Sequence, residues 1–348
     1  MGLVSLFRKK NRKILFTTPS HAGKFFIMHK FYQWYKADIS EVDAYNPEDA
    51  LKKSQEWASK LYGSKSTHYL TNGSSSGVIA SILSVCAGEE KSKILIWKNS
   101  HCCHLNGAKL ANAEVVFYDL PFNNEWGIYD KISPENVEEL FIEHKPKAIV
   151  ITSPSYEGIV CDIKVISEIC KKYKVYLIVD EAHGALYPFS EKLPESAIKY
   201  ADFTIQSLHK TAGGLNPTAL LHCNCEIDIQ KYLDMITTTS PSYPMLATIE
   251  ANIKFLNSLK GKKVLNKLID TIIDLKSKTK NVEFYGDDIT KILVKKDGIS
   301  GMELSEKFFE EFDIEDEKTN EKSTMLLTGI GTREKDLKKL FFVLENKV

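Results

Sequence analysis

The sequence lacks long apolar runs. Its 348 residues contain no stretch close to the roughly 18 to 20 apolar residues that a membrane span requires. The N-terminus also lacks the apolar core and cleavage site of a signal peptide, so we expect a cytoplasmic protein. Basic residues gather within residues 1–13, where a frayed, solvated end is a simpler explanation than an amphipathic segment that contacts a membrane.

An excess of charge of either sign is also missing. Lysine plus arginine and aspartate plus glutamate both total 46, so no sequence-wide field attracts nucleic acid or anionic lipid. Two phosphate-binding patterns, GxxxxGK[ST] and GxGxxG, are absent. We therefore expect a small-molecule partner that is neither nucleic acid nor a nucleotide.

Cysteines are few, and their spacing shows no regular pairs. The seven cysteines, an odd number, lie between Cys86 and Cys225 without a secretory signal, which favours reduced thiols. The close pairs Cys102-Cys103 and Cys223-Asn224-Cys225 lack a second matching pair, as a structural zinc site would require. No metal site is expected.

What the chain has is an alternation of short β-rich runs with amphipathic helical stretches, typical of βαβ units. Helices are predicted over 76–86, 134–143 and 163–173. Strands are predicted over 67–71, 94–97, 114–118, 148–152, 175–179, 203–206 and 219–222. The pattern predicts an α/β fold with a mostly parallel seven-stranded sheet flanked by helices, whose strand ends share one ligand-binding edge.

The pattern changes near residue 241. Helices are predicted over 244–259, 264–278 and 300–312, the last started by a serine cap, with strands over 289–294 and 324–327 and a closing helix to residue 344. We expect an N-terminal arm and helix over 1–45, a large α/β domain over 46–258 and a small C-terminal α+β domain over 259–348.

Asp180 directly follows the predicted strand 175–179, which places a carboxylate at the ligand edge. Pyridoxal phosphate (PLP) needs such an anion, because its ring accepts electrons only while the pyridine nitrogen stays protonated. A strand-end carboxylate can instead cap a loop or bind a metal. Asp180 is the candidate partner of the ring nitrogen.

Lys210 follows the next predicted strand, in the run Ser207-Leu208-His209-Lys210-Thr211. A lysine amine forms a Schiff base with an aldehyde, and a neighbouring hydroxyl and imidazole can bind the phosphate of such a cofactor. Most loop lysines are simply solvated. The position of Lys210 one βα unit after Asp180 makes the pair specific for PLP.

Two further segments support this interpretation. Thr71-Asn72-Gly73-Ser74-Ser75-Ser76-Gly77 leads into an apolar helix, and hydroxyls and free N–H groups at a helix N-terminus bind phosphate. His101 follows the strand 94–97 and could stack on a pyridine ring, with Ala182 on the opposite face. His104 is the second choice, although both histidines could be helix-start residues, and a metal site with the adjacent cysteines ranks below stacking.

Together these segments resemble the PLP-dependent ornithine/lysine/arginine decarboxylase family, which has an aspartate-aminotransferase-like fold. The segments that carry the resemblance, in chain order, are Thr18-Pro19-Ser20-His21-Ala22-Gly23, Asn72-Gly73-Ser74-Ser75-Ser76, His101, Thr152-Ser153-Pro154-Ser155-Tyr156-Glu157-Gly158, Asp180-Glu181-Ala182-His183-Gly184, Gln206-Ser207-Leu208-His209-Lys210-Thr211 and Thr238-Thr239-Ser240-Pro241-Ser242-Tyr243. Larger members also carry an N-terminal receiver-like domain and a C-terminal domain, for which this sequence is too short.

The resemblance implies a role for each matched residue. Lys210 is the Schiff-base lysine, Asp180 and His101 act with it on the ring, and His209 is a second proton carrier. The residues implied to hold the cofactor are Ser74, Ser75, Ser76, His101, Asp180, Ala182, His183, Ser207, His209 and Lys210, with Ser74 nearer to a helix cap. The residues implied on the substrate side are His21, Ser153, Tyr156 and Glu315, the last as a carboxylate for a basic side chain or else a solvated charge.

The implied activity is decarboxylation of a basic or other polar amino acid, through an external aldimine and a quinonoid, in a homodimer that shares its active sites. The same cofactor serves aminotransferases and Cα–Cβ lyases, so these stay as alternatives, with Arg333 the late arginine that a transaminase could use. A silent binding or regulatory paralogue is the second alternative. Ser20 and Ala185-Leu186 depart from the family pattern and indicate a changed pocket wall.

Overall fold

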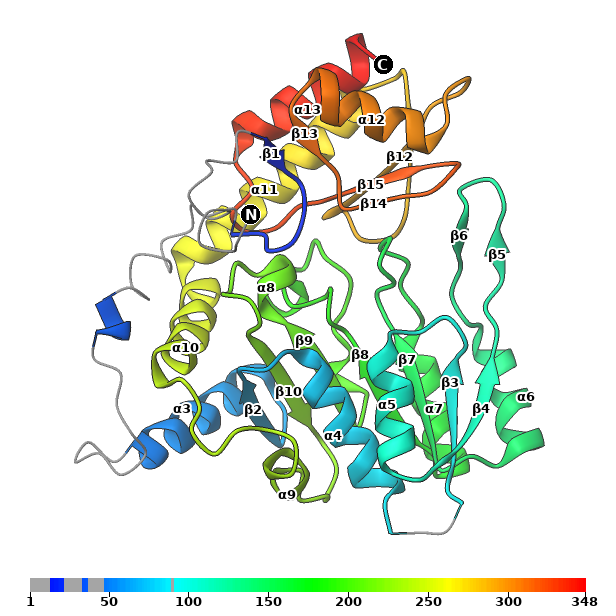
Figure 1. Cartoon of the computed structure of the whole chain (residues 1–348), viewed down its shortest axis with the longest axis vertical. Coiled ribbons are helices and arrows are strands. Elements are labelled where there is room, and N and C mark those ends of the chain that lie inside the picture. The colour runs from blue at the N-terminus through cyan, green and yellow to red at the C-terminus, as the bar shows by residue number, and fades with distance from the viewer. Residues whose placement is uncertain (1–12, 22–32, 37–46, 89–90) are drawn as a thin grey trace, which may run out of the picture.

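The computed structural model describes residues 13–21, 33–36, 47–88 and 91–348 (Figure 1). Most of the predicted N-terminal arm, including Ala22 and Gly23 of the first matched segment, lies outside these residues. Among the described helices, none combines the length and apolarity that crossing a membrane requires. The domain limits at residues 45 and 258 stay predictions.

The centre of the fold is one seven-stranded sheet in the order β2-β10-β9-β8-β7-β3-β4. Its strands are β2 Ser66–Leu70, β3 Lys93–Trp97, β4 Glu114–Tyr118, β7 Ala148–Thr152, β8 Tyr176–Asp180, β9 Phe203–Ser207 and β10 Ala219–Cys223. Strand β10 is antiparallel to both of its neighbours, and the other pairs are parallel. All seven predicted strands are confirmed, and so is the mostly parallel α/β fold.

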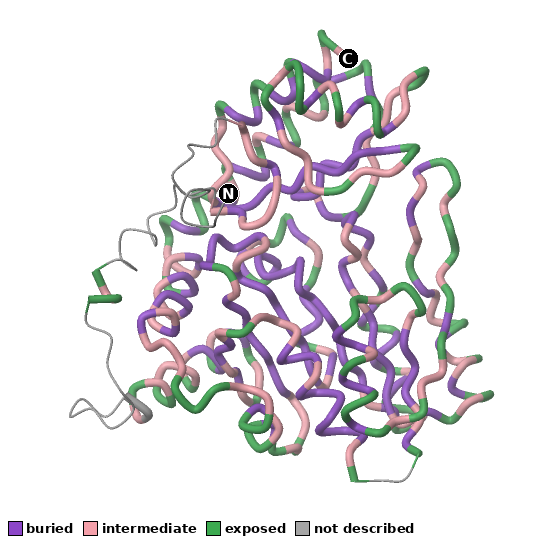
Figure 2. The backbone as a smooth tube through the Cα atoms, viewed as in Figure 1, coloured by how far each residue is buried: buried purple, intermediate pink, exposed green. Residues whose placement is uncertain are grey.

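Helices cover both faces of this sheet, because alternate strand residues point to opposite sides. Ile94 and Ile96 pack beneath α4 (Ser74–Cys86) and α5 (Cys102–Leu110), while Leu95 between them packs with α6 (Pro134–His144) and α7 (Ile163–Tyr173). Helices α3 (Pro47–Tyr62) and α10 (Tyr243–Asn257) share a further core. Figure 2 shows the buried residues running along the central strands.

A second, four-stranded sheet follows in the chain, in the order β11-β12-β15-β14. Its strands are β11 Glu283–Tyr285, β12 Lys291–Lys295, β14 Lys318–Thr319 and β15 Thr324–Leu327. Helices α11 (Leu259–Lys278), α12 (Gly301–Glu311) and α13 (Glu334–Asn346) supply its core. Helix α12 begins with a capping box in which Ser300 and Glu303 bond to each other's backbone N–H, as the predicted serine cap required.

Two short strand pairings lie outside the two main sheets. Strand β1 (Ile14–Leu15) pairs in parallel with β13 (Ile314–Glu315) beside the second sheet. The hairpin of β5 (Phe122–Asn123) and β6 (Ile128–Tyr129) rises from the large sheet toward the second one (Figure 1). The space between the hairpin, the second sheet and the carboxyl ends of the large strands holds the candidate site.

Candidate active site

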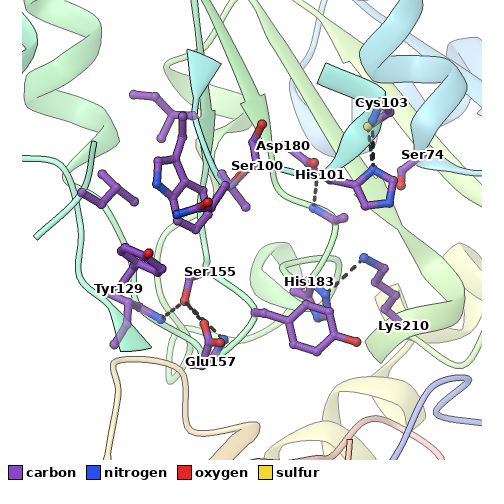
Figure 3. Close-up of a pocket in the computed structure, with 18 of the residues that line it drawn as sticks. Ser74, Ser100, His101, Cys103, Tyr129, Ser155, Glu157, Asp180, His183 and Lys210 are labelled. Carbon is purple, nitrogen blue, oxygen red and sulfur yellow. Dashed lines mark hydrogen bonds between the residues drawn. The ribbon is translucent and has the colours of Figure 1, made fainter. Parts of the chain in front are cut away.

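A cavity of about 600 Å³ lies at the carboxyl edge of the large sheet. Its lining includes Ser74, Ser75, His101, Tyr156, Asp180, Ala182, His183, His209 and Lys210, all singled out from the sequence. Figure 3 shows Lys210, His101 and Asp180 toward one end of this cavity, and Tyr129, Ser155 and Glu157 toward the other. The fold therefore brings together residues from segments more than a hundred positions apart.

Asp180 ends strand β8 with both carboxylate oxygens engaged. His104 Nε2 donates to Oδ2 at 2.9 Å, and the Ala182 N–H donates to Oδ1 at 3.2 Å. Burial alone raises the pKa of Asp180, but the hydrogen bond from His104 and the charge of Lys210 outweigh it, so the net pKa is lowered. Asp180 is an oriented anion at the cavity wall.

Lys210 lies on the short helix α8 (Leu208–Thr211), which starts where β9 ends. Its Nζ donates to His183 Nε2 at 3.1 Å. Burial lowers the pKa of Lys210. Burial, together with the charges of Lys210 and Lys291, also holds the pKa of His183 well below its ordinary value. His183 is therefore neutral and accepts at Nε2, and its buried Nδ1 has no hydrogen-bond partner in the part of the chain that the structure describes.

The N-terminus of α4 forms another wall. Gly73 precedes it with φ 88°, and no side chain caps the helix. Ser74 and Ser75 line the cavity, and Ser207 Oγ donates a hydrogen bond to Ser74 Oγ at 2.8 Å. Ser76 Oγ instead bonds within its own turn, to Asn72 Oδ1 at 2.8 Å, and Ser76 is not among the lining residues.

His101 caps α5, and its Nδ1 accepts from the Cys103 N–H at 3.3 Å. Its ring is largely exposed in the cavity, and burial of the remainder lowers its pKa. His209 is anchored differently, by a contact of 3.1 Å between Nδ1 and the Thr218 carbonyl. Both imidazoles are thus fixed by the backbone while their rings border the cavity.

Three potential metal ligands, Cys103, His104 and Asp180, lie within 4.8 Å of one another, all buried. His104 Nε2 is already engaged with Asp180. Burial raises the pKa of the Cys103 thiol to about 12, which keeps it protonated and a weak ligand. The cluster is explained by its own hydrogen bonding.

The substrate-side candidates are more scattered. The Tyr156 hydroxyl donates to Glu317 Oε1 at 2.5 Å, and its ring lies 4.6 Å from that of His183. Ser153 is buried outside the lining, with its Oγ accepting from the Cys161 N–H at 3.1 Å. Glu315 lies in β13, where it pairs with Leu15 of β1, and it is not a lining residue.

His21 is not a lining residue either. It follows Ser20, whose N–H donates to the His209 carbonyl at 3.1 Å. The described part of the first matched segment therefore lies against the α8 helix of the same chain.

The structure adds contacts that the sequence did not predict. His104 orients Asp180, and Glu317 receives hydrogen bonds from Tyr156 and from the Thr18 N–H, the latter at 2.6 Å. Glu157 lines the cavity and is bonded by Lys318 at 2.5 Å. Glu157 lies in the matched run after Pro154, so the sequence offered a signal that it belongs to the site. The contacts of Glu317 depend on the tertiary fold, and the sequence offered no such signal.

Comparison with known proteins defines first the class and then the family. The fold is that of PLP-dependent aminotransferases and decarboxylases. Escherichia coli constitutive lysine decarboxylase superposes with TM-score 0.74 at 22% identity over 98% of this chain and 59% of its own. Ureidoglycine-glyoxylate aminotransferase of Bacillus subtilis superposes with TM-score 0.73 at 14% identity over 97% of this chain and 94% of its own.

The family model for the major domain of Orn/Lys/Arg decarboxylases matches residues 4–292, and the chain belongs to this family. Arginine decarboxylase of Bacillus subtilis is 27% identical over 86% of this chain. The chain spans 65% of the length of that enzyme and 52% of the length of the uncharacterized protein YaaO of the same organism.

Proposed function

We propose that this chain is a PLP-dependent carboxy-lyase that acts on a basic or other polar amino acid. The observation that carries the proposal is the meeting of Lys210, Asp180 and the uncapped N-terminus of α4 around one cavity. An amine, an oriented carboxylate and a set of free N–H and hydroxyl donors are the groups that an aldehyde, a pyridine nitrogen and a phosphate require.

The donor set fits the cofactor at each part. Ser74, Ser75 and the first-turn N–H groups of α4 would hold the phosphate, because no side chain among the described residues caps that helix end. Lys210 would attach the aldehyde. PLP, when bound, supplies an electron sink for the bond that breaks at Cα.

The protein's own residues then have separate tasks. Asp180, ionised and fixed by His104, would hold the proton on the ring nitrogen. Lys210 and His209 are the groups placed to return a proton to Cα. Burial of Lys210 lowers its pKa, so more of its amine is unprotonated near neutral pH than for an exposed lysine.

Glu157 is the carboxylate we assign to a basic substrate side chain, in place of Glu315. It lines the cavity, whereas Glu315 does not, and its present partner Lys318 is half-exposed and replaceable by a substrate cation. Glu157→Gln should raise KM for a basic amino acid with less effect on kcat, and an unchanged KM would refute this assignment.

Decarboxylation is favoured over transamination by the position of Arg333. This arginine forms two hydrogen bonds with Asp336, at 2.6 and 2.7 Å, and is not among the lining residues. It is therefore committed elsewhere and does not bind a substrate carboxylate in the cavity.

The test uses the purified chain with added PLP. An absorbance band near the visible edge should appear and should be abolished in Lys210→Ala. Incubation with single amino acids should then release carbon dioxide and the corresponding amine. Formation of a keto acid would defeat the decarboxylase assignment, and the lack of any band would favour the silent paralogue.

We also propose that the enzyme is a homodimer with shared active sites, which rests on the family resemblance. Light scattering of the active protein measures this directly. A monomer with full activity would contradict it.

A further inference from the structure

Lys291 is a fully buried cation behind the active-site wall. It is the first residue of β12 in the second sheet, and the side chains of Lys291 and Asp288 are both 0% exposed. Their Nζ and Oδ2 atoms lie 3.0 Å apart. An ion pair this deep costs desolvation, so its retention calls for an explanation beyond stability.

The pair sits between the two loops that carry site residues. Lys291 Nζ also donates to the His183 carbonyl at 3.3 Å, and its stem packs on Gly158, where an added Cβ would come within 2.9 Å of Lys291 Cγ. The N–H groups of Asp287 and Asp288 both donate to the Gly158 carbonyl at 3.0 Å. The turn before β12 therefore joins the loop of Tyr156 to the loop of His183.

Asp288 also forms hydrogen bonds with neighbouring side chains of this region. It accepts from the Tyr187 hydroxyl at 3.0 Å and from the Thr290 hydroxyl at 2.7 Å. Burial raises the pKa of Asp288, but Lys291 and Thr290 outweigh burial and the net pKa is lowered, so Asp288 is ionised.

The cation of Lys291 acts on two groups in front of it. It contributes to the lowered pKa of His183 and of Lys210, after burial in both cases. The other charged and titratable groups that act on these two residues are Cys103, Asp180, His209, Glu317 and Lys318. Lys291 is thus the cation that acts on His183 and Lys210 from the side away from the cavity.

We infer that Lys291 is a positioning residue of the active site. It fixes the His183 loop through the His183 carbonyl and adds its positive charge to the effect of burial, so that Nε2 accepts from the Lys210 amine and that amine is held ready to react with an aldehyde. The inference rests on the proposed function of Lys210, but its test uses protein without cofactor.

The test measures the reactivity of Lys210 against pH. Trace labelling with acetic anhydride, read by mass spectrometry of the peptide that contains Lys210, gives the pH at which half of this amine is reactive. In Lys291→Met we expect this midpoint to rise by about one unit, the effect of a single nearby charge. The double variant Lys291→Met, Asp288→Asn leaves no unpaired buried charge and should fold. Its midpoint should rise by less than that of Lys291→Met, because the negative charge of Asp288 is removed as well.

Asp288→Asn is the matched control. It disturbs the same buried contact but retains the Lys291 cation, so the midpoint should not rise. An unchanged midpoint in the double variant, or an equal rise in Asp288→Asn, would overturn the inference and leave the proposed decarboxylase intact. A raised midpoint in a protein that shows no absorbance band with PLP would defeat the proposed function alone.

Discussion

At the scale of single residues, the hydrogen bond between His104 and Asp180 orients the carboxylate that we propose holds the ring nitrogen. Leucine at position 104 would leave the buried carboxylate with the Ala182 N–H as its remaining partner among those described. Hydrogen bonds to charged groups contribute about 1.5 to 3 kcal/mol. We expect His104→Leu to lower the free energy of unfolding by about 2 kcal/mol and to lower kcat, as denaturation and steady-state assays would show.

His104→Gln is the control for this prediction, because its amide can still donate to Asp180. It should retain more stability and more activity than the leucine variant. Equal losses in the two variants would mean that imidazole packing matters and the hydrogen bond does not.

Glu181 provides a pH-dependent contribution at the same scale. Burial raises its pKa from 4.5 to about 7, despite hydrogen bonds from the Ala197 N–H, Ser196 and Gln206. The folded state thus binds a proton more tightly than the unfolded state, so this stabilisation is complete below about pH 4.5 and is lost as the pH rises through about 7. The loss corresponds to roughly 3 kcal/mol.

Glu181→Gln should therefore flatten this pH dependence. The Gln206 Oε1 atom has no partner among the described residues and can accept from the new amide once the Gln206 side chain flips. Unfolding free energies of both proteins at several pH values between 4.5 and 8 measure the difference. Parallel curves would show that another group titrates.

The substrate-side residues show where prediction from the sequence fails. Lys210 and Asp180 were predicted to share a cleft because both follow parallel strands, and the sheet topology alone brings such ends together. Glu315 is predicted from an acidic run, which does not determine how β13 lies. The side chain two residues later is the one that meets Tyr156, because the position of this segment depends on tertiary packing.

At the scale of elements, β1 ties the start of the described chain to its end. Phe16, directly after β1, is 0% exposed within the core of the second sheet, and its carbonyl accepts from the Leu327 N–H at 2.7 Å. We expect Phe16→Ala to cost about 3 to 5 kcal/mol of unfolding free energy, measured by denaturant titration. A loss below about 1 kcal/mol would show that this segment is not part of the folding unit.

The regular elements were predictable because their periodicity is strong. Strands β4, β7 and β15 begin and end at the predicted residues, and helix α7 does too. The β5–β6 hairpin was not predicted, since each strand has two residues and shows no alternation. Its order comes from contacts with the second sheet, which local sequence does not encode.

At the scale of the whole molecule, that hairpin and the loop after β7 share a core with the second sheet. Trp126, in its turn, is 4% exposed, and its ring stacks on Tyr285 of β11 with centroids 5.2 Å apart. Its carbonyl accepts from Ser323 Oγ at 2.8 Å. The residues of this shared core are Trp126, Ile128, Ile159, Leu293, Met325 and Leu327.

The shared core leads us to expect that both sheets unfold in one cooperative transition, and that Trp126→Ala weakens this coupling. The variant should lose about 3 to 5 kcal/mol, and amide exchange should accelerate more in β12 and β15 than in β8. Phe122→Ala is the matched control, since Phe122 lies on the same hairpin but is 48% exposed, and it should cost less than about 1 kcal/mol.

Because Gly127 to Ile132 line the cavity, Trp126→Ala should also weaken PLP binding, which absorbance titration measures. Equal effects of the two variants would show that the hairpin acts locally and that the sheets fold independently.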